Sequence, residues 1–526
     1  MKTPFANKLL IGALTLSLQI LAHTTAPAQM PVWTNYYNGP ANSNDRANAM
    51  ALDPSGNVLV TGYSYGSGTG YDYATVKYSS AGVPLWTNRY NGPGNNTDDP
   101  LAVAVDAGEN VLVAGYSYGG GSGFDYAVIK YSAAGLPLWT NRYNGPMNGD
   151  DEAYAVAVDT NGNVFVTGAA DISGTGLSGE DITTIKYSSA GAQLWLNSYN
   201  GPGNGEDGGT AIAVDSNGDV LVTGTSTGSS GNFDYVTIKY SNAGVPLWTN
   251  RYDGPGGSAD QPYTIALDAS NNVFVTGYSI GSGTGKDYAT LKYSSTGLPL
   301  WTNRYDGAAA GDDIGFRLAI DRSGNVFVTG YSLGSGSGYD YATIKYSGAG
   351  VPLWTNFYNG PANADDYALA VAVDGSGSAF VTGYSTGSDS GQDYVTIKYS
   401  GAGTALWTNS YNGLGNGNDS GYAVAADGRG NVIVTGYSTG DGTGWDYTTI
   451  KIKDSTAAAP LLAVSLTTPN ILAVSWPAYW TGTLQMNTNL ATTNWITAPG
   501  TITNNGTFNS LSLTRQPGAT FFRLKQ

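Results

Sequence analysis

The chain has no cysteine and a single histidine, His23, among its 526 residues. Without cysteine it forms no disulfide bond, thiol nucleophile or thiolate metal site. His23 lies in an N-terminal segment that we expect to be removed, so a Ser-His-Asp triad and a histidine-bound zinc ion are also excluded. We therefore expect a protein that is not an enzyme, with no catalytic, cofactor-binding or metal-binding residues.

Charged residues are scarce as well. They make up 12% of the sequence, and 39 acidic residues against 23 basic ones give a formal net charge of −16. Binding to nucleic acid or anionic membranes requires positive surface, so neither is an expected partner. Disorder is excluded, because 41% of the residues are hydrophobic and 12% are aromatic. The 75 glycines and 38 tyrosines favour an all-β fold with many tight turns.

Residues 1–28 have the pattern of a secretory signal peptide. Lys2 and Lys8 precede an apolar stretch, Leu9–Ala22, and Ala26–Ala28 is an A-x-A cleavage site. The apolar stretch is shorter than the ~20 residues that a membrane span needs. We expect cleavage near Ala28 and a secreted, extracellular or cell-envelope protein that is not inserted in a membrane. Loss of two lysines changes the net charge to −18, from 21 basic and 39 acidic residues.

Eight similar segments fill most of the chain. Each contains the pattern W-T-N-R-Y-N-G-P, followed by A-V-A-V-D, N-V-F-V-T-G-Y-S and D-Y-A-T-I-K-Y-S, with small variations. The tryptophan recurs every 53 residues, except for one interval of 56 residues. Its eight copies are Trp33, Trp86, Trp139, Trp195, Trp248, Trp301, Trp354 and Trp407. Such a period indicates a repeat architecture in which each copy is one supersecondary unit.

Each unit has four segments with the alternation of β-strands. In the second unit these are Leu101–Val105, Asn110–Tyr116, Asp125–Tyr131 and Leu138–Tyr143. Pro stands two residues before Trp in six units, and Pro suits the edge of a sheet because it donates no backbone hydrogen bond. We therefore place the Trp strand at the outer edge of each sheet and the Ala/Val-rich strand nearest the axis.

Four-stranded sheets repeated at this period are typical of a β-propeller. The first Trp strand, Met30–Tyr37, precedes any complete unit, and the last three strands, within Tyr422–Lys453, have no Trp strand after them. Pairing of these two ends would close the ring and remove its open edges. The sequence thus predicts an all-β, eight-bladed β-propeller over residues 29–454, closed by the N-terminal strand. A linear β-solenoid is the alternative.

The repeat stops after Asp454. We expect a linker at 455–460 and a small C-terminal β domain, similar to a β-sandwich, at 461–526. Its strand signals are Leu461–Leu466, Ile471–Trp476 and Leu511–Leu513. Its expected core includes Trp476, Trp480 and Trp495.

Three aspartates and one lysine recur in every unit. Asp accepts hydrogen bonds from backbone N–H groups in turns, so we interpret the aspartates as structural. The lysine alternates with Tyr along a strand, and we expect it to pair with an Asp between two blades.

Each of these residues has eight copies. The Asp that ends the inner strand has the copies Asp53, Asp106, Asp159, Asp215, Asp268, Asp321, Asp374 and Asp427. The lysine is Lys77, Lys130, Lys186, Lys239, Lys292, Lys345, Lys398 or Lys451. A second Asp precedes the inner strand, and its copies are Asp45, Asp98, Asp151, Asp207, Asp260, Asp313, Asp366 and Asp419. The third opens the lysine-bearing strand, and its copies are Asp72, Asp125, Asp181, Asp234, Asp287, Asp340, Asp393 and Asp446. We expect the acidic excess over the lysines to face water.

Calcium is the one ion that these aspartates suggest. Asp159–Asn163 and Asp215–Asp219 place side-chain oxygens at alternate positions, as calcium loops do. The Gly and the distal Glu of an EF-hand are missing. We therefore expect no cofactor, with calcium as the alternative.

Tyr and Asn crowd the loops, as at Tyr63–Tyr65, Tyr71–Tyr73 and Tyr90–Gly92. Such residues suit polar recognition, including stacking on sugar rings, and packing between blades is the alternative interpretation.

The third unit differs from the others. Its loop, within Gly168–Asp181, has three extra residues and lacks the usual Tyr. This loop is either a unique site or a surface loop that tolerates change.

The repeated motifs resemble a known family. A-V-A-V-D-x-x-G-N-V-x-V-T-G-Y-S and D-Y-A-T-I-K-Y-S-x-A-G-x-P-L-W resemble the bacterial β-propeller repeat known as the SBBP repeat, over about residues 31–454. The tail F-F-R-L-K resembles a small C-terminal module of secreted proteins from environmental bacteria. The resemblance implies a propeller in an exported protein, without an established reaction or ligand. The family's usual name implies seven blades, whereas eight copies are present here.

A second resemblance lies in Ser80–Trp86, which is similar to the docking motif of eight-bladed quinoprotein dehydrogenases. Those enzymes bind pyrroloquinoline quinone and calcium, often beside a vicinal Cys pair that this chain lacks. A non-enzymatic scaffold of envelope assembly is built on the same ring.

Together these observations predict a non-catalytic, monomeric binding or scaffold protein at the cell envelope or outside the cell. Its expected partner is a protein or polysaccharide at the cell surface. A multivalent, lectin-like carbohydrate-binding propeller is the first alternative, and a quinoprotein-like enzyme is the second.

Overall fold

A computed structural model describes residues 29–172, 179–309, 311–454, 463–468, 471–477, 483–487, 495–504, 508–514 and 521–525. Their regular structure is entirely β, in strands β1 to β39. None of these residues is in a helix, so none of them forms a helical membrane span. The predicted signal peptide at 1–28 and the predicted linker at 455–460 lie outside the described residues.

The repeat region folds into four-stranded antiparallel sheets, one for each sequence unit. The first sheet contains β2 (Asp45–Leu52), β3 (Val58–Gly66), β4 (Gly70–Tyr78) and β5 (Pro84–Tyr90). The second contains β6 (Asp98–Val105), β7 (Val111–Tyr118), β8 (Phe124–Tyr131) and β9 (Pro137–Tyr143). The third contains β10 (Asp151–Val158), β11 (Val164–Asp171), β12 (Glu180–Tyr187) and β13 (Gln193–Tyr199). The fourth contains β14 (Asp207–Val214), β15 (Val220–Thr227), β16 (Phe233–Tyr240) and β17 (Pro246–Tyr252).

The second half of the region repeats this order. The fifth sheet contains β18 (Asp260–Leu267), β19 (Val273–Gly281), β20 (Gly285–Tyr293) and β21 (Pro299–Tyr305). The sixth contains β22 (Asp313–Ile320), β23 (Val326–Gly334), β24 (Gly338–Tyr346) and β25 (Pro352–Tyr358). The seventh contains β26 (Asp366–Val373), β27 (Ala379–Thr386), β28 (Gln392–Tyr399) and β29 (Ala405–Tyr411). The eighth contains β30 (Asp419–Ala426), β31 (Asn431–Thr439), β32 (Trp445–Lys453) and, from the N-terminus, β1 (Pro31–Tyr37).

Strand β6 is longer than the sequence predicts. It begins at Asp98, three residues before the predicted Leu101, because Asp98 still pairs with Ser117 on β7. Asp and Pro normally break strands, which hid this start. The register shifts between Pro100 and Ala102, and the inner strands without proline have the same shift, as between Ala47 and Ala49 of β2.

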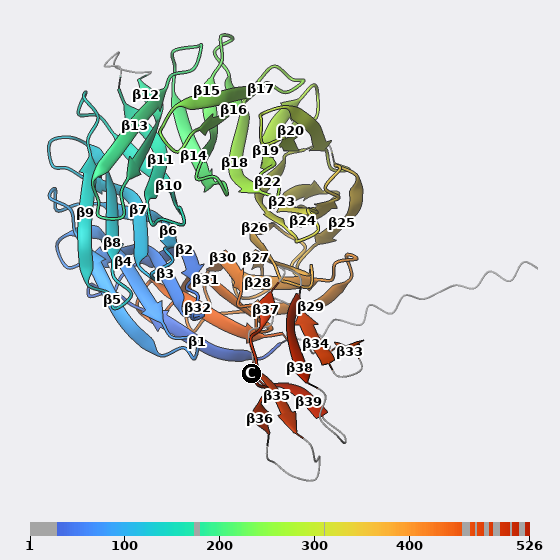
Figure 1. The fold of residues 1–526 in the computed structure, drawn as a ribbon. Coiled ribbons are helices and arrows are strands. Elements are labelled where there is room, and N and C mark those ends of the chain that lie inside the picture. The colour runs from blue at the N-terminus through green and yellow to red at the C-terminus, as the bar shows by residue number, and fades with distance from the viewer. Residues whose placement is uncertain are drawn as a thin grey trace, which may run out of the picture.

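The Trp strand lies at the edge of its sheet, as predicted from its proline, since β5 pairs with β4 alone. Figure 1 shows the sheets arranged around a common axis, with the Ala/Val-rich strands nearest to it. The eighth sheet is completed by β1, in which Trp33 pairs with Lys451 of β32. The eighth sheet also contacts the first, because the Tyr447 hydroxyl donates to the carbonyl of Ala74 at 3.0 Å. The architecture is all-β, with repeated sheets consistent with a β-propeller.

The hydrophobic core lies between neighbouring sheets. Leu59 and Tyr73 of the first sheet pack with Val111, Val113 and Ile129 of the second, and all five are almost fully buried. Similar clusters join the following sheets. Each blade therefore buries its faces only against its neighbours, which is why the units are stable as an array and not alone.

The C-terminal residues form two small sheets. Their strands are β33 (Ala463–Thr468), β34 (Ile471–Pro477), β35 (Thr483–Asn487), β36 (Ile496–Thr497), β37 (Thr503–Asn504), β38 (Phe508–Thr514) and β39 (Phe521–Lys525). Val474, Trp476 and Leu511 of the first sheet share one core with Leu484 of the second. Trp495 instead packs against the Arg523 guanidinium, 4.3 Å from its ring centre, and Trp480 lies outside the described residues.

Candidate functional site

The recurring Trp, Lys and Asp residues meet at the junctions between sheets. In the first sheet the Lys77 ammonium lies 2.9 Å from a carboxylate oxygen of Asp53, and both side chains are buried. Lys77 and Trp86 also donate to one acceptor in the second sheet, the carbonyl of Ala133, at 3.3 and 3.1 Å. Although burial opposes the charged form, Lys77 and Asn57 lower the pKa of Asp53. These residues join one blade to the next and leave no reactive group exposed.

The predicted pairing of Lys and Asp between blades is wrong for most units. In seven units the two partners belong to the same sheet, with 2.8 to 3.8 Å between the ammonium nitrogen and a carboxylate oxygen. The reason is that the Asp follows the first strand of the sheet and the Lys lies on the third. The bond that crosses the junction goes to a backbone carbonyl instead. Lys398 is the exception, since it also pairs with Asp454 of the eighth sheet. Lys186 donates to the Asn242 carbonyl at 3.0 Å.

Most of the remaining recurrent aspartates do not face water, which corrects the sequence-based expectation. Asp45 is fully buried and accepts hydrogen bonds from the backbone N–H groups of Gly39 and Tyr65, at 2.5 and 3.1 Å. Asp72 is also buried, and one of its oxygens lies 2.7 Å from the Arg89 guanidinium. These carboxylates hold the connection between consecutive sheets.

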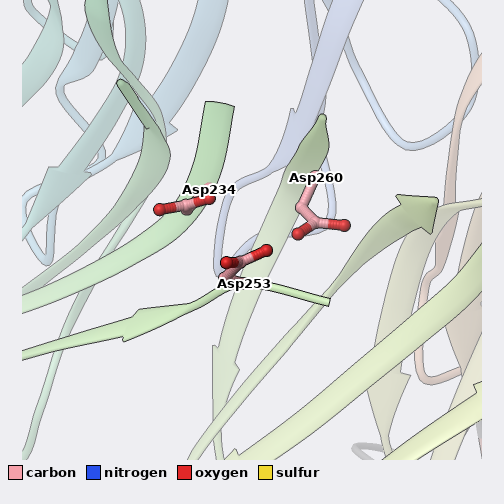
Figure 2. Close-up of side chains that lie close together, drawn as sticks. All are labelled: Asp234, Asp253 and Asp260. Atoms are coloured by element: carbon pink, nitrogen blue, oxygen red, sulfur yellow. The ribbon is translucent and has the colours of Figure 1, made fainter. Parts of the chain in front are cut away.

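Two junctions carry a third carboxylate where the other units have Asn. In one, a carboxylate oxygen from each of Asp234, Asp253 and Asp260 lies within 4.8 Å of the others, as Figure 2 shows. Asp287, Asp306 and Asp313 form the second such group. Oxygen ligands of this kind suit a hard divalent cation. However, the Arg251 guanidinium lies 2.6 Å from Asp234 and already supplies a cation there.

The two turns with calcium-like spacing direct their oxygens elsewhere. Asp215 accepts hydrogen bonds from the backbone N–H groups of Asn217 and Asp219, at 2.8 and 3.0 Å. Its other oxygen lies 2.8 Å from the Lys239 ammonium. Asp159 likewise accepts from Asn161 and Asn163. The expectation of no cofactor, with calcium as the alternative, stays a prediction at these turns.

The tyrosines of the first unit separate into packing and surface residues. Tyr73 is almost fully buried, donates to the Ala127 carbonyl of the next sheet, and packs edge-on against Tyr90 at 5.5 Å. Tyr63 and Tyr71 pack edge-on at 4.6 Å. Tyr65 is the exposed member of the group. The repeated tyrosines therefore serve mainly as contacts within and between blades.

A cavity of about 740 Å³ lies on the axis of the ring. Every inner strand contributes to its wall with the side chain three residues after its first Asp. These side chains are Asn48, Leu101, Tyr154, Thr210, Tyr263, Phe316, Leu369 and Tyr422. The volume is within the range of roughly 300–1,000 Å³ that is common for small-molecule sites. We call this space the axial cavity.

The wall of the axial cavity is where the blades differ most. The junction residues are nearly identical in all copies, whereas the eight wall residues include aliphatic, aromatic and polar side chains. The position after each first Asp varies as widely, with Arg46, Asp99, Glu152, Gly208, Gln261, Ile314, Tyr367 and Ser420. Arg317 replaces the Ala or Thr of the other copies and also lines the cavity. Eight near-copies thus surround one asymmetric cavity.

Acidic residues gather on one side of the axial cavity. Glu180 and Glu206 line it near the third and fourth sheets. Burial, followed by the nearby charges of Glu152 and Glu206, raises the pKa of Glu180 to about 7. Asp99 of the second sheet is not a lining residue but accepts a hydrogen bond from the wall residue Asn48 at 2.7 Å, and burial raises its pKa to about 7, against the opposing effect of Arg46. Perturbed carboxyl groups in a cavity mark a candidate site.

A group of aromatic residues lines the cavity on the fifth, sixth and eighth sheets. Tyr263 packs against Phe316 at 5.2 Å and against Tyr278 at 6.0 Å, and all three line the cavity. On the eighth sheet Tyr422 also lines it, and the Arg46 guanidinium lies over its ring at 4.3 Å from the centre. We call Tyr263, Tyr278, Phe316 and Tyr422 the aromatic arc.

The third unit, whose loop differs from those of the other units, also contributes to this cavity. Ala169 and Glu180 flank its loop and line the wall, whereas residues 173–178 of the loop lie outside the described residues. Sequence reasoning missed the cavity itself. The feature of the sequence that indicates the cavity is the variation among the eight copies of the inner strand, since recurring residues mark the junctions instead.

The comparisons with known proteins concern the fold. No curated protein matches the chain. Among solved structures, a protein of unknown function from Dyadobacter fermentans is 12% identical and matches 81% of this chain and 100% of its own, with a TM-score of 0.40. Drosophila Plexin A in complex with Semaphorin 1b is 10% identical, with 82% and 88% covered and a TM-score of 0.40. A eukaryotic initiation factor is 9% identical, with 69% and 88% covered and a TM-score of 0.37. At these TM-scores the likenesses bear on neither ligand nor function.

One family model matches part of the repeat region. The model is described as a beta-propeller repeat, SBBP, and it covers residues 304–336. This segment runs from the end of β21 to the turn after β23, so it spans the connection between the fifth and sixth sheets. The SBBP beta-propeller repeat predicted from the sequence is thereby confirmed at residues 304–336.

Proposed function

We propose that the protein is an exported, non-catalytic binding protein, built as an eight-bladed β-propeller that its N-terminal strand closes. Its ligand site is the axial cavity. One observation carries this proposal: the blades are nearly identical at their junctions and differ at the side chains that line the cavity. Stability alone would be served by eight similar inner strands, so the varied wall suits recognition of one particular ligand.

The chemistry of the wall favours binding over catalysis. The structure describes no histidine or cysteine, so the cavity has neither the common general base nor a thiol nucleophile. Most of its lining consists of aromatic, amide and hydroxyl side chains, which give contact area and hydrogen bonds. Export follows from the segment 1–28, and the small C-terminal β domain is a second module whose role the proposal leaves open.

A carbohydrate is the second candidate for the ligand. Aromatic faces beside planar polar groups, such as Tyr263 beside Gln261, suit the apolar faces and hydroxyl groups of sugar rings. The multivalent version of this idea has less support, because Tyr73 and its copies are buried between blades. We therefore favour one carbohydrate site in the axial cavity over eight sites at the blades.

The experiment is a binding screen of the mature chain, residues 29–526, against an oligosaccharide array and a small-molecule library by thermal shift. The matched variant is Tyr263→Ala with Phe316→Ala, and the control is Leu138→Ala, an exposed residue of an outer strand. We expect ligands that stabilise the parent chain and the control, and that lose at least tenfold in affinity for the cavity variant. Ligands that bind all three chains equally, or none at all, would contradict the proposal.

A further inference from the structure

The wall of the axial cavity is hollowed between the third and fourth sheets. At one position of the second strand six sheets have Tyr: Tyr63, Tyr116, Tyr278, Tyr331, Tyr384 and Tyr437. The third and fourth sheets have Ala169 and Thr225 there, and both line the cavity. Gly208 and Thr210 complete the small wall on β14. We call this space the hollow, and the missing side chains leave room for part of a ligand.

The hollow is bordered by carboxylates that have no basic partner. Glu180 on β12 and Glu206, just before β14, both line the cavity. Within the described ranges neither forms an ion pair with Lys or Arg, in contrast to the paired aspartates of the junctions. Asp207 of β14 lines the cavity as well, and the hydroxyl of the wall residue Tyr154 donates to Glu152 at 2.5 Å. Crowded carboxylates in a partly enclosed cavity attract a cation.

The basic residues of the cavity lie on other sheets. Arg317 is on β22 of the sixth sheet, and its guanidinium donates to the carbonyl of Phe316 at 3.0 Å. Arg46 is on β2 of the first sheet, stacked over Tyr422 and near Asp99. The charges of the wall are therefore separated, and the negative end is at the hollow.

The aromatic arc supplies the second half of a cation site. The faces of Tyr and Phe attract cations, and this wall already holds two in that way, the Arg46 guanidinium over Tyr422 at 4.3 Å and the Lys286 ammonium over Tyr278 at 4.8 Å from the ring centres. Tyr263 and Phe316 are the other two members of the arc. Phe233, on β16 beside the hollow, also lines the cavity and is 37% exposed. A ligand with an ammonium group at the carboxylates would thus meet an aromatic face next to it.

We propose that the axial cavity binds an organic cation, with its ammonium group in the hollow beside Glu180 and Glu206 and its body against the aromatic arc. This inference rests on the proposed function and names the chemical class of its ligand. The raised pKa of Glu180, which is due to burial and then to the nearby carboxylates Glu152 and Glu206, agrees with it, because a bound cation would favour the ionised form of that carboxyl group.

The test uses two probes that differ in charge and share a ring body: a glucosamine tetramer with free amines and its fully N-acetylated counterpart. A third probe, spermidine, carries ammonium groups without a ring. Binding to the mature chain is measured by titration calorimetry at low and high salt. The variant is Glu180→Gln with Glu206→Gln. The control is Glu109→Gln, in the turn between β6 and β7, whose carboxylate accepts from Ser55 and is not among the groups that line the cavity.

We expect the glucosamine tetramer to bind at least tenfold more tightly than the acetylated one. The preference should fall at high salt, disappear in the double variant and remain in the control. Equal binding of both tetramers, or a preference that survives the double variant, would overturn the cation inference and leave cavity binding intact. Failure of both amine probes to bind would also overturn it. Cavity binding is judged separately by the screen of the Tyr263 and Phe316 variant.

Discussion

The junctions between blades and the wall of the axial cavity use the same repeat in opposite ways. At the junctions Lys, Trp and Asp recur with the same partners, as when Lys130 and Trp139 both donate to the Ser189 carbonyl at 3.2 Å. In the axial cavity the corresponding positions of the eight inner strands share little beyond their place in the fold. Repetition thus marks what the ring needs for stability, and variation marks what a ligand would meet.

The largest expected effect is at a junction. Lys130→Met leaves Asp106 buried without its cation, which lies 2.8 Å away in the parent chain. Removing one partner of a buried ion pair costs about 3–5 kcal/mol, so we expect a loss of that order in the free energy of unfolding by urea denaturation. Lys286→Met, at a half-exposed lysine, is the control and should change it by less than about 1 kcal/mol. Equal effects of the two variants would contradict the stabilising role assigned to the buried ion pairs of the junctions.

A smaller effect is expected at the tyrosine bonds between sheets. The Tyr126 hydroxyl donates to the Thr183 carbonyl at 3.0 Å, within a buried junction. Tyr126→Phe should lower the free energy of unfolding by about 1 kcal/mol, because the ring keeps its packing and the Thr183 carbonyl loses one of its two hydroxyl donors, with Thr167 remaining. The third sheet has Ile182 at this position, so Ile182→Val provides a matched junction without a hydroxyl. An unchanged stability of Tyr126→Phe would contradict the role assigned to the bond.

Two carboxyl groups in and beside the cavity should contribute to the dependence of stability on pH, together with Asp151 and Asp181 of the junctions, whose pKa values burial raises to about 7 and about 6. Burial raises the pKa of Asp99 and of Glu180 to about 7, well above their ordinary values. Between about pH 5 and 7 the folded chain then binds more protons than the unfolded chain, so the melting temperature should fall as pH rises. Asp99→Asn with Glu180→Gln should flatten this slope, as followed by thermal melts at several pH values. A slope of opposite sign, or one that the variant leaves unchanged, would count against these ionisations.

The smallest expected effect on stability is at the cavity wall itself. Arg317 is exposed to the cavity and its guanidinium bonds a neighbouring carbonyl. Arg317→Ala should change the free energy of unfolding by no more than about 0.5 kcal/mol, as is usual for surface sites. A urea titration beside Lys130→Met gives the contrast directly. A loss of several kcal/mol would mean that the wall is structural, like the junctions.

The sequence predicted the fold more fully than the site. The 53-residue period, the edge prolines and the unmatched Trp strand led to the four-stranded sheets and to the pairing of β1 with β32, which the structure contains. The predicted partners of the recurring lysines were wrong, because strand alternation does not distinguish a contact within a sheet from a contact across a junction. The sequence also placed the excess carboxylates in water, whereas Asp45 and its copies are buried as acceptors of backbone hydrogen bonds.

What the sequence alone determined is the architecture, since hydrophobic alternation, turn residues and the repeat period are local properties that eight copies reinforce. The absence of cysteine likewise excludes disulfide bonds and thiol chemistry from the sequence alone. Only the tertiary structure decided that Glu180, Tyr263 and Phe316, far apart in the chain, line one cavity. The physical reason is that the arrangement of the sheets around an axis brings one position from every blade to the axial cavity. A local sequence pattern contains no information about such contacts between distant residues.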